Sequence, residues 1–439
     1  MDIAAARRRY VMICALFWLP LGLAIAPQLL LFAERGMTLA AIAGFFAAHS
    51  LTAALLELPT GGLSDVLGRR AVLVAAGLTD LAAFALLGLG TDAWVFVLGM
   101  ALKGAGRALS SGPAEAWYVD TVHAAAGPDA ELRSGLARGG SATSAVLAVG
   151  TLVGGALPWL LGLGPDLGAW LSRATSGVVL PLSVPVLLAA AVDIVFVLYV
   201  LTALPEPPRT PVGPRAVLRG VPATIVSGVR LAGGDALVRR VLLGVAATGA
   251  AFAAVELLTP GRVADLAGDP EAGAVLFAGL ACVGYVCSAL GSHLAPLTAR
   301  LTGGSGRAVL AGLGAGAGGL LLLAATASAA GPVPVALGAA GFALVHLGLG
   351  AAGPNENDLL HRRVTSAGRA TALSVQSLAL QLACALAAPA VGALPAGPLP
   401  WLVGGVALTA GTLLWTRPVP APRAASEAAL PEPVRPGAA

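Results

Sequence analysis

Four polar or charged side chains are evenly spaced within one otherwise apolar stretch of the sequence. Lys103, Arg107, Ser111 and Glu115 follow one another at intervals of four residues. In one continuous helix, this spacing places them on a single face. An ionisable group in the hydrocarbon core of a membrane costs roughly 2.5–3.5 kcal/mol on insertion scales, so such groups normally face a wet cavity. We predict that this face lines a cavity; the alternative is an ion pair between Lys103 and Asp80.

Two carboxylates within apolar stretches are candidates for carrying a proton. Glu115 follows Arg107 by two helical turns, and changing hydration beside that cation would switch the carboxyl between its neutral and charged forms. Glu256, in the second half of the chain, is the alternative. Gln28, Gln376 and Gln381 are uncharged candidates for lining the same cavity, and Gln28 and Gln376 are assigned to the substrate or proton pathway.

No pattern in the sequence is typical of an enzyme site. There is no Walker loop, no cluster with the spacing of metal ligands and no nucleophile–base arrangement. We therefore expect no catalytic residue, no metal and no cofactor, with a proton gradient rather than ATP as the energy source. The four cysteines fall inside apolar stretches and are expected to be small buried side chains.

Composition places the whole chain in a membrane. Of 439 residues, 57% are apolar and only 11% are charged, as expected for a bundle of spans of about 20 residues each. The formal charge of +4 reflects basic loops and gives no reason to expect nucleic acid as a partner. The twelve predicted spans are residues 10–32, 38–60, 71–90, 94–120, 139–160, 180–203, 241–261, 271–293, 308–330, 333–354, 370–393 and 398–416.

The basic residues predict the orientation of these spans. With the N-terminus inside, 21 of the 26 Lys and Arg residues fall in cytoplasmic segments and three fall outside. An odd number of spans would destroy this asymmetry. No cleavable signal peptide is expected, because Arg7, Arg8 and Arg9 lead into a span that is too long. We predict a multi-pass protein of the cytoplasmic membrane with both termini in the cytoplasm.

The two halves of the chain resemble each other. Gly112-Pro113-Ala114-Glu115 near the end of the fourth span has a counterpart, Gly353-Pro354-Asn355-Glu356, near the end of the tenth. We predict an all-α membrane protein in which two six-helix bundles are related by this repeat. The predicted domains are a bundle at 1–203, a cytoplasmic linker with a possible amphipathic helix at 204–240, a bundle at 241–416, and a disordered cytoplasmic tail at 417–439.

A short charged segment joins the second and third spans. A segment of this kind cannot lie in hydrocarbon, so it forms a tight turn at a membrane face. Its pattern, Gly-x-Leu-x-Asp-x-x-Gly-Arg-Arg, resembles the signature loop of the major facilitator superfamily. The matching residues are Gly61, Leu63, Asp65, Gly68, Arg69 and Arg70.

The resemblance implies a partner for this loop and a second motif. In that superfamily an acid near the inner end of the fourth helix pairs with the loop arginine and seals the cytoplasmic side, which points to Asp120 and Arg69 here. Span 5 also resembles the Gly-Pro-x-x-Gly-Gly motif of proton-coupled exporters, with Thr151 at the proline position. Its glycines would let helices 5 and 8 approach closely; they are Gly150, Gly154 and Gly155.

The resemblance as a whole implies a secondary active transporter of the twelve-helix drug:proton antiporter type. It would export a small, amphipathic molecule by alternating access, with protons and the lipid bilayer as its other partners, and it would act as a monomer. Span 4 departs from the family pattern, because Met100 and Lys103 occupy the positions of its usual Arg and Gln. A proton-coupled importer is the alternative within transport. A membrane enzyme or a non-transporting sensor is the alternative from another class.

Overall fold

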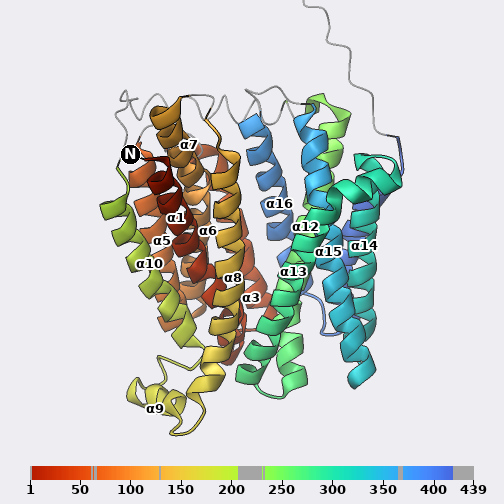
Figure 1. The fold of residues 1–439 in the computed structure, drawn as a ribbon. Coiled ribbons are helices and arrows are strands. Elements are labelled where there is room, and N and C mark those ends of the chain that lie inside the picture. Colours follow the sequence, from red (N-terminus) through yellow and green to blue (C-terminus); the bar gives the residue numbers. More distant parts are fainter. Residues whose placement is uncertain are drawn as a thin grey trace, which may run out of the picture.

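The computed structural model describes residues 2–60, 63, 67–127, 130–205, 230, 233–363 and 369–418, and within these every regular element is a helix (Figure 1). The first half contains α1 Ile3–Ile25, α2 Pro27–Glu34, α3 Leu39–Thr60, α5 Arg69–Leu89, α6 Ala93–Ser110, α7 Pro113–Ala126, α8 Arg133–Leu161, α9 Leu167–Ala174 and α10 Ser183–Ala203. The second half contains α12 Ala236–Ala267, α13 Pro270–Thr302, α14 Ser305–Thr326, α15 Pro332–His361, α16 Arg369–Gly392 and α17 Pro398–Leu414.

Each of the twelve predicted spans coincides with one helix or with two consecutive helices. Ten described helices are long and apolar enough to cross a membrane by length and composition, and α17 is a shorter apolar helix. The first span is divided into α1 and α2 and the fourth into α6 and α7. The all-helical, twelve-span architecture is therefore confirmed. Most of the predicted linker and all but the first residues of the predicted tail lie outside the described residues.

The helices form two groups that lie side by side (Figure 1). One cluster of buried apolar side chains runs from Leu237 to Trp415 and draws only on the second half. Another, between Ala6 and Leu204, draws only on the first half. The halves meet where α3 packs on α16 and α8 on α13.

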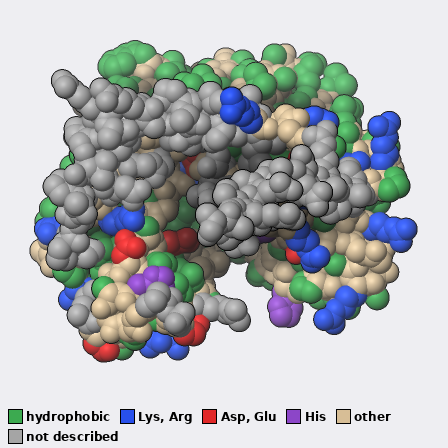
Figure 2. All heavy atoms as spheres, turned by 90° about the horizontal axis from the view of Figure 1, so that it is seen from above, with side chains coloured by type: hydrophobic (Ala, Val, Ile, Leu, Met, Phe, Trp, Pro, Cys, Tyr) green, Lys and Arg blue, Asp and Glu red, His purple; other side chains and the backbone are tan. Residues whose placement is uncertain are grey.

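The halves are tightly packed at the end of the molecule where α9 lies. A Cβ added to Gly392 of α16 would lie 2.5 Å from the Cβ of Ala43 on α3. A Cβ at Gly155 of α8 would lie equally close, 2.5 Å, to the Cβ of Ala278 on α13. At the opposite face, Figure 2 shows a hollow between the two halves. The two ends of the bundle interface therefore differ in how closely the halves approach.

The fourth span is not the continuous helix that the sequence predicted. α6 ends at Ser110, Ser111 has an extended backbone, and Gly112 is left-handed with φ 95°. Pro113 then begins α7. A residue before proline is disfavoured in the helical region, and glycine adopts positive φ without steric cost. The predicted common face of Lys103, Arg107, Ser111 and Glu115 is therefore wrong beyond Arg107.

The glycines of α8 mostly face a different helix from the one predicted. Cβ atoms at Gly150 and Gly154 would meet the backbone of α1 at Leu19, Gly22 and Leu23. Only Gly155 faces α13, the eighth span. Small residues bring membrane helices close because lipid supplies no hydrophobic drive for their association. The motif therefore serves mainly the contact of α8 with α1 inside the first half.

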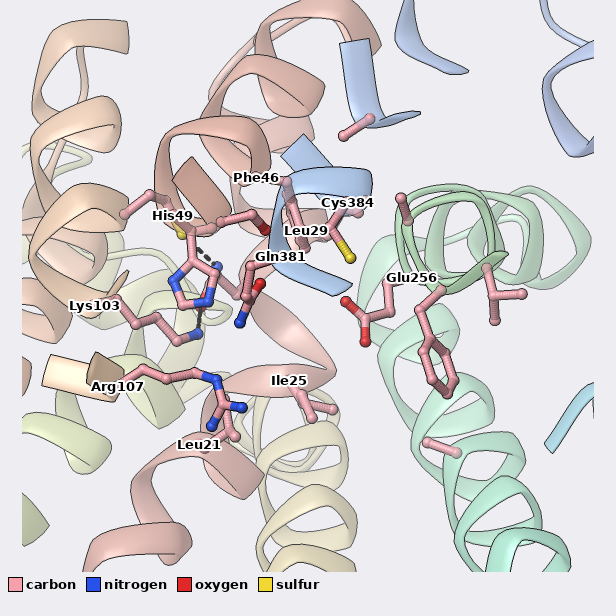
Figure 3. A pocket seen from close by; sticks show the side chains of 18 of the residues that line it. Leu21, Ile25, Leu29, Phe46, His49, Lys103, Arg107, Glu256, Gln381 and Cys384 are labelled. Carbon is pink, nitrogen blue, oxygen red and sulfur yellow. Dashed lines mark hydrogen bonds between the residues drawn. The ribbon is translucent and has the colours of Figure 1, made fainter. Parts of the chain in front are cut away.

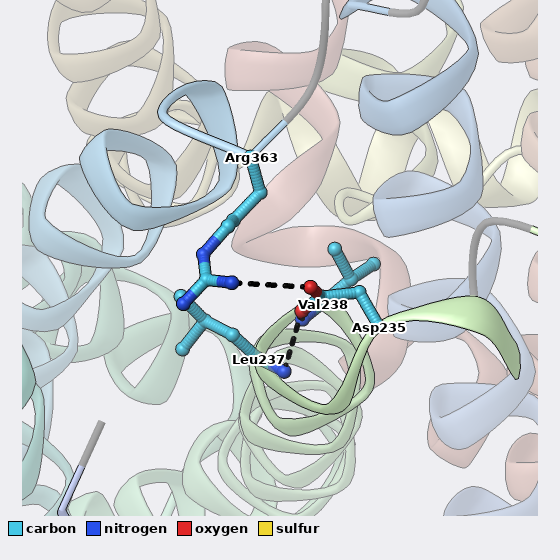
Figure 4. Close-up of polar contacts among 4 residues, drawn as sticks. All are labelled: Asp235, Leu237, Val238 and Arg363. Carbon is cyan, nitrogen blue, oxygen red and sulfur yellow. Dashed lines mark hydrogen bonds and ion pairs between the residues drawn. The ribbon is translucent and has the colours of Figure 1, made fainter. Parts of the chain in front are cut away.

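Asp235 fixes the beginning of the second half (Figure 4). Its Oδ1 accepts hydrogen bonds from the backbone N–H groups of Leu237 at 2.7 Å and Val238 at 3.1 Å, which caps α12. Its Oδ2 lies 3.2 Å from Nη1 of Arg363, which follows α15. One carboxylate thus ties the first turn of α12 to the end of α15.

Gly154→Ala should destabilise the protein, because its Cβ would collide with the carbonyl group of Leu23. Forcing extra volume into a packed interface typically costs about 1–3 kcal/mol. Gly140→Ala is the matched control on the same helix, since a Cβ there would meet nothing within 4 Å. Thermal unfolding of the two purified variants in the same detergent should show a lower unfolding temperature than wild type for Gly154→Ala and an unchanged one for Gly140→Ala. Equal transitions would contradict the close α1–α8 contact.

Asp235→Ala should destabilise the protein more than Asp235→Asn. Asparagine keeps the capping oxygen and loses the ion pair, whereas alanine loses both, and a lost N-cap costs about 0.5–2 kcal/mol. Thermal unfolding in detergent compares the two. If the two variants have the same unfolding temperature, the capping hydrogen bonds contribute nothing to stability beyond the ion pair with Arg363.

Candidate functional site

A cavity of about 520 Å³ lies between the two halves. Its walls come from α1, α2, α3, α5 and α6 of the first half and from α12, α13, α15 and α16 of the second. Volumes of about 300–1,000 Å³ are typical of sites for small molecules. Aromatic side chains form much of the lining; they are Phe17, Trp18, Phe46, Phe84, Phe252, Phe277, Tyr285 and Phe342.

Lys103 of α6 and Gln28 of α2 meet in the cavity wall. The ammonium group donates to Gln28 Oε1 at 2.8 Å, and Gln28 Nε2 lies 3.2 Å from the sulfur of Met100. Lys103 Nζ also lies 5.2 Å from the centre of the Phe84 ring, within the range of a cation–π contact. Lys103 and Asp80 are both described, and their side chains do not form the ion pair that was the alternative prediction. Lys103 is held by a neutral partner, so its charge is not neutralised by direct contact with a carboxylate.

Arg107 and Glu256 extend into the cavity from opposite sides (Figure 3). Arg107 lies one turn after Lys103 on α6, and Glu256 lies on α12 of the other half. Both side chains are exposed to the cavity. Among the described residues, neither side chain has a hydrogen bond or an ion pair. The cavity therefore presents an open guanidinium and an open carboxylate to whatever fills it.

Ser111 and Glu115 lie elsewhere. Ser111 Oγ donates to Glu57 Oε1 at 3.1 Å, so it joins the break after α6 to α3. Glu115 is exposed in the first turn of α7 and is not among the residues that line the cavity. The helix break turns α7 away from the face that Lys103 and Arg107 share.

Gln376 also lies outside the cavity wall, in a separate contact. Its Nε2 donates to Asn357 Oδ1 at 2.9 Å, which joins α16 to α15. Gln381, one and a half turns later on α16, is buried and does line the cavity. Sequence periodicity offered no way to choose between the two amides, because the rotation of α16 depends on its neighbours.

The loop that resembles the family signature is described only in part. Gly61 and Asp65 lie outside the described residues. Gly68 has φ 99° directly before α5. Arg69 Nη2 lies 3.2 Å from Asp120 Oδ2 on α7, so the expected pair of side chains is in contact.

The other basic residue of this loop, Arg70, makes a different contact. It donates from Nη2 to the carbonyl oxygen of Leu201 on α10. Together with Arg69 it ties the start of α5 to two other helices of the first half, α7 and α10.

Several polar residues of this region carry weaker sequence signals. Asp80 and Asp193 are 8% and 1% exposed, and among the described residues Asp80 Oδ1 and both oxygens of Asp193 have no hydrogen-bond partner. Asp80 packs against Gly106 of α6. His346 lines the cavity while its Nδ1 lies 2.9 Å from the Phe342 carbonyl. Tyr285 also lines the cavity, and no pattern in the sequence singled it out.

Comparison with known proteins identifies the fold. No protein-family model matches the sequence, and no curated protein matches it significantly. Solved structures do match. The nucleoside transporter NupG superimposes with a TM-score of 0.69 at 12% identity, over 95% of this chain and 98% of that one.

Two further structures agree over similar lengths. A bacterial homolog of the human lysosomal transporter Spinster gives a TM-score of 0.68 at 15% identity, over 93% of this chain and 95% of that one. The xylose transporter XylE from E. coli gives 0.66 at 13% identity, over 94% and 98%. At these identities the likeness establishes the major facilitator fold of twelve helices in two halves, and no more.

Proposed function

We propose that this chain is a secondary active transporter that moves a small, amphipathic molecule across the membrane by alternating access. The observation that carries the proposal is the charged, aromatic cavity between two helical halves that are packed together at one end. Rocking of the halves about this cavity would open it to each side in turn. The fold supports this reading, since NupG, the Spinster homolog and XylE are transporters.

We infer that the hollow face of Figure 2 is the cytoplasmic one. The excess of basic residues in the segments on this side supports the assignment. The Spinster homolog is described as inward-facing and XylE as partially occluded and inward open. The protein would then lie in the cytoplasmic membrane with both termini inside, and the α9 end would face outward.

We further propose that transport is proton-coupled efflux, with Glu256 as the proton-carrying group. Its carboxylate is open to the cavity, so a proton and a positively charged ligand group would compete for the same oxygens. Competition of this kind is the requirement for antiport. Glu115 was the first candidate from the sequence, but its place outside the cavity wall leaves Glu256 as the stronger one.

Glu256→Gln should abolish accumulation driven by a pH gradient. The neutral amide of the glutamine cannot exchange a proton. The affinity of this variant for the ligand should therefore no longer decrease as the pH is lowered. Counterflow at raised ligand concentration should persist, because the cavity and its aromatic lining remain. The measurement is flux in proteoliposomes, with and without a pH gradient, of a compound that the wild-type protein exchanges. Glu115→Gln is the matched control and should behave as wild type; the opposite pattern would return the coupling role to Glu115.

Arg69→Ala and Asp120→Ala should each reduce transport by about tenfold or more while barely changing stability. The pair is partly exposed, with side-chain exposures of 20% and 47%, and pairs of this kind contribute about 0.2–1 kcal/mol. A double-mutant cycle measured by thermal unfolding and by counterflow separates the two effects. Undiminished transport in both single variants would remove the pair from the gating mechanism.

A further inference from the structure

Two groups of opposite charge face the cavity, and neither has a hydrogen-bond or ion-pair partner among the described residues. The guanidinium of Arg107 and the carboxylate of Glu256 both lie open to it from opposite sides (Figure 3). They do not form an ion pair with each other within the described structure. Burying an unpaired charge is costly, so groups left in this state at the centre of an apolar bundle need water or a ligand to complete them.

The cationic side of the cavity suits an acidic group. Lys103 and Arg107 lie one turn apart on α6, which brings two positive charges to the same side. A guanidinium presents parallel N–H groups that fit a carboxylate or a phosphate. Lys103 is already oriented by its 2.8 Å hydrogen bond to Gln28. Asp80 of α5 also lines the cavity, but Arg107 has no ion-pair partner among the described residues, so a ligand that offered only an amine would leave Arg107 without a counter-charge.

The opposite side suits a basic group. Glu256 belongs to the second half, across the cavity from α6. A carboxylate accepts charge-assisted hydrogen bonds from an ammonium group. A ligand that offered only an acid would leave Glu256 unpaired and would meet its negative charge.

Aromatic side chains of the second half also line the cavity. Phe252 neighbours Glu256 on α12, and Phe277 and Tyr285 of α13 also line the cavity. Aromatic surfaces of this kind bind a flat or hydrophobic body by burial and by ring contacts. The cavity volume of about 520 Å³ accommodates a body of that kind between the two charged ends.

We propose that the cavity binds amphipathic zwitterions, with the acidic group at Lys103 and Arg107, the amine at Glu256 and an aromatic or branched apolar body between them. The proposal rests on the cavity being the transport site, and it names the substrate class. It also accounts for antiport, because the amine of the ligand and the coupling proton would use the same carboxylate.

Three probes with one body test the charge requirement. The zwitterion is para-(aminomethyl)hydrocinnamate. In para-ethylhydrocinnamate a methyl group replaces the ammonium, and in para-propylbenzylamine a methyl group replaces the carboxylate. Binding of each to the purified full-length protein in detergent is measured by isothermal titration. Each analogue lacks one charged group and the hydrogen bonds that it would make, so the zwitterion should bind about tenfold or more tightly than either analogue.

Variants on each side of the cavity should lose one part of the preference for the zwitterion and keep the other. Glu256→Gln should remove the preference for the zwitterion over para-ethylhydrocinnamate and keep its preference over para-propylbenzylamine. The double variant Lys103→Gln, Arg107→Gln should do the reverse. Glu115→Gln and Arg173→Gln are matched controls outside the cavity and should bind all three probes as wild type. Thermal unfolding establishes that each variant is folded.

Other outcomes overturn the proposal. Equal or tighter wild-type binding of a singly charged analogue would do so, as would the absence of binding by all three probes to folded protein. These failures are distinct from failure of the transport function. Gradient-driven flux of a compound from another charge class would keep the transporter and discard the zwitterion. Selective zwitterion binding without any gradient-driven flux in proteoliposomes would do the opposite.

Discussion

An ionisable side chain inside a bundle surrounded by hydrocarbon needs water, a partner or a ligand. Three charged side chains of this protein meet the constraint, whereas Asp193 is buried and neither of its oxygens has a hydrogen-bond partner among the described residues. Lys103 meets it with the amide of Gln28. Arg107 and Glu256 meet it by facing the cavity between the halves. The pairing requirement that would penalise these two groups in a sealed core is therefore met at the cavity between the halves.

Close glycine contacts occur both within each half and between the halves. Within each half, glycines bring helices into backbone contact, as Gly154 does between α8 and α1. Between the halves the tightest contacts lie at the end where α9 is found, at Gly392 and Gly155. Close packing therefore joins the helices of each half and also joins the two halves at the α9 end.

The Gly-Pro motif occurs in both halves, and the chain adopts a different conformation at each copy because the neighbouring helices differ. α15 continues through Pro354, and the Gly350 carbonyl freed by that proline accepts a hydrogen bond from Ser292 Oγ at 3.0 Å. In the first half the chain breaks before Pro113. There the hydroxyl of Thr60 donates to a carbonyl in the last turn of α6, that of Ala108, at 3.0 Å, as at a finished helix end. A neighbouring hydroxyl thus supports a continuous helix in one half and a terminated one in the other.

The sequence by itself determined the properties that depend on local composition. Apolar runs of sufficient length must be helices in a membrane, since every backbone polar group has to be satisfied internally, and the twelve spans followed from that requirement. The resemblance of the charged loop to the superfamily signature also pointed to the pair of Arg69 and Asp120, whose side chains are in contact.

The tertiary structure alone decided which faces meet. The break at Gly112 removed Glu115 from the face of Arg107, and the rotation of α12 brought Glu256 into the cavity. The glycines of α8 turned out to face mainly α1, and Gln381 rather than Gln376 reached the cavity wall. Helix rotation and helix breaks are set by side chains on neighbouring helices, which are distant in sequence, and no periodicity within a single span records them.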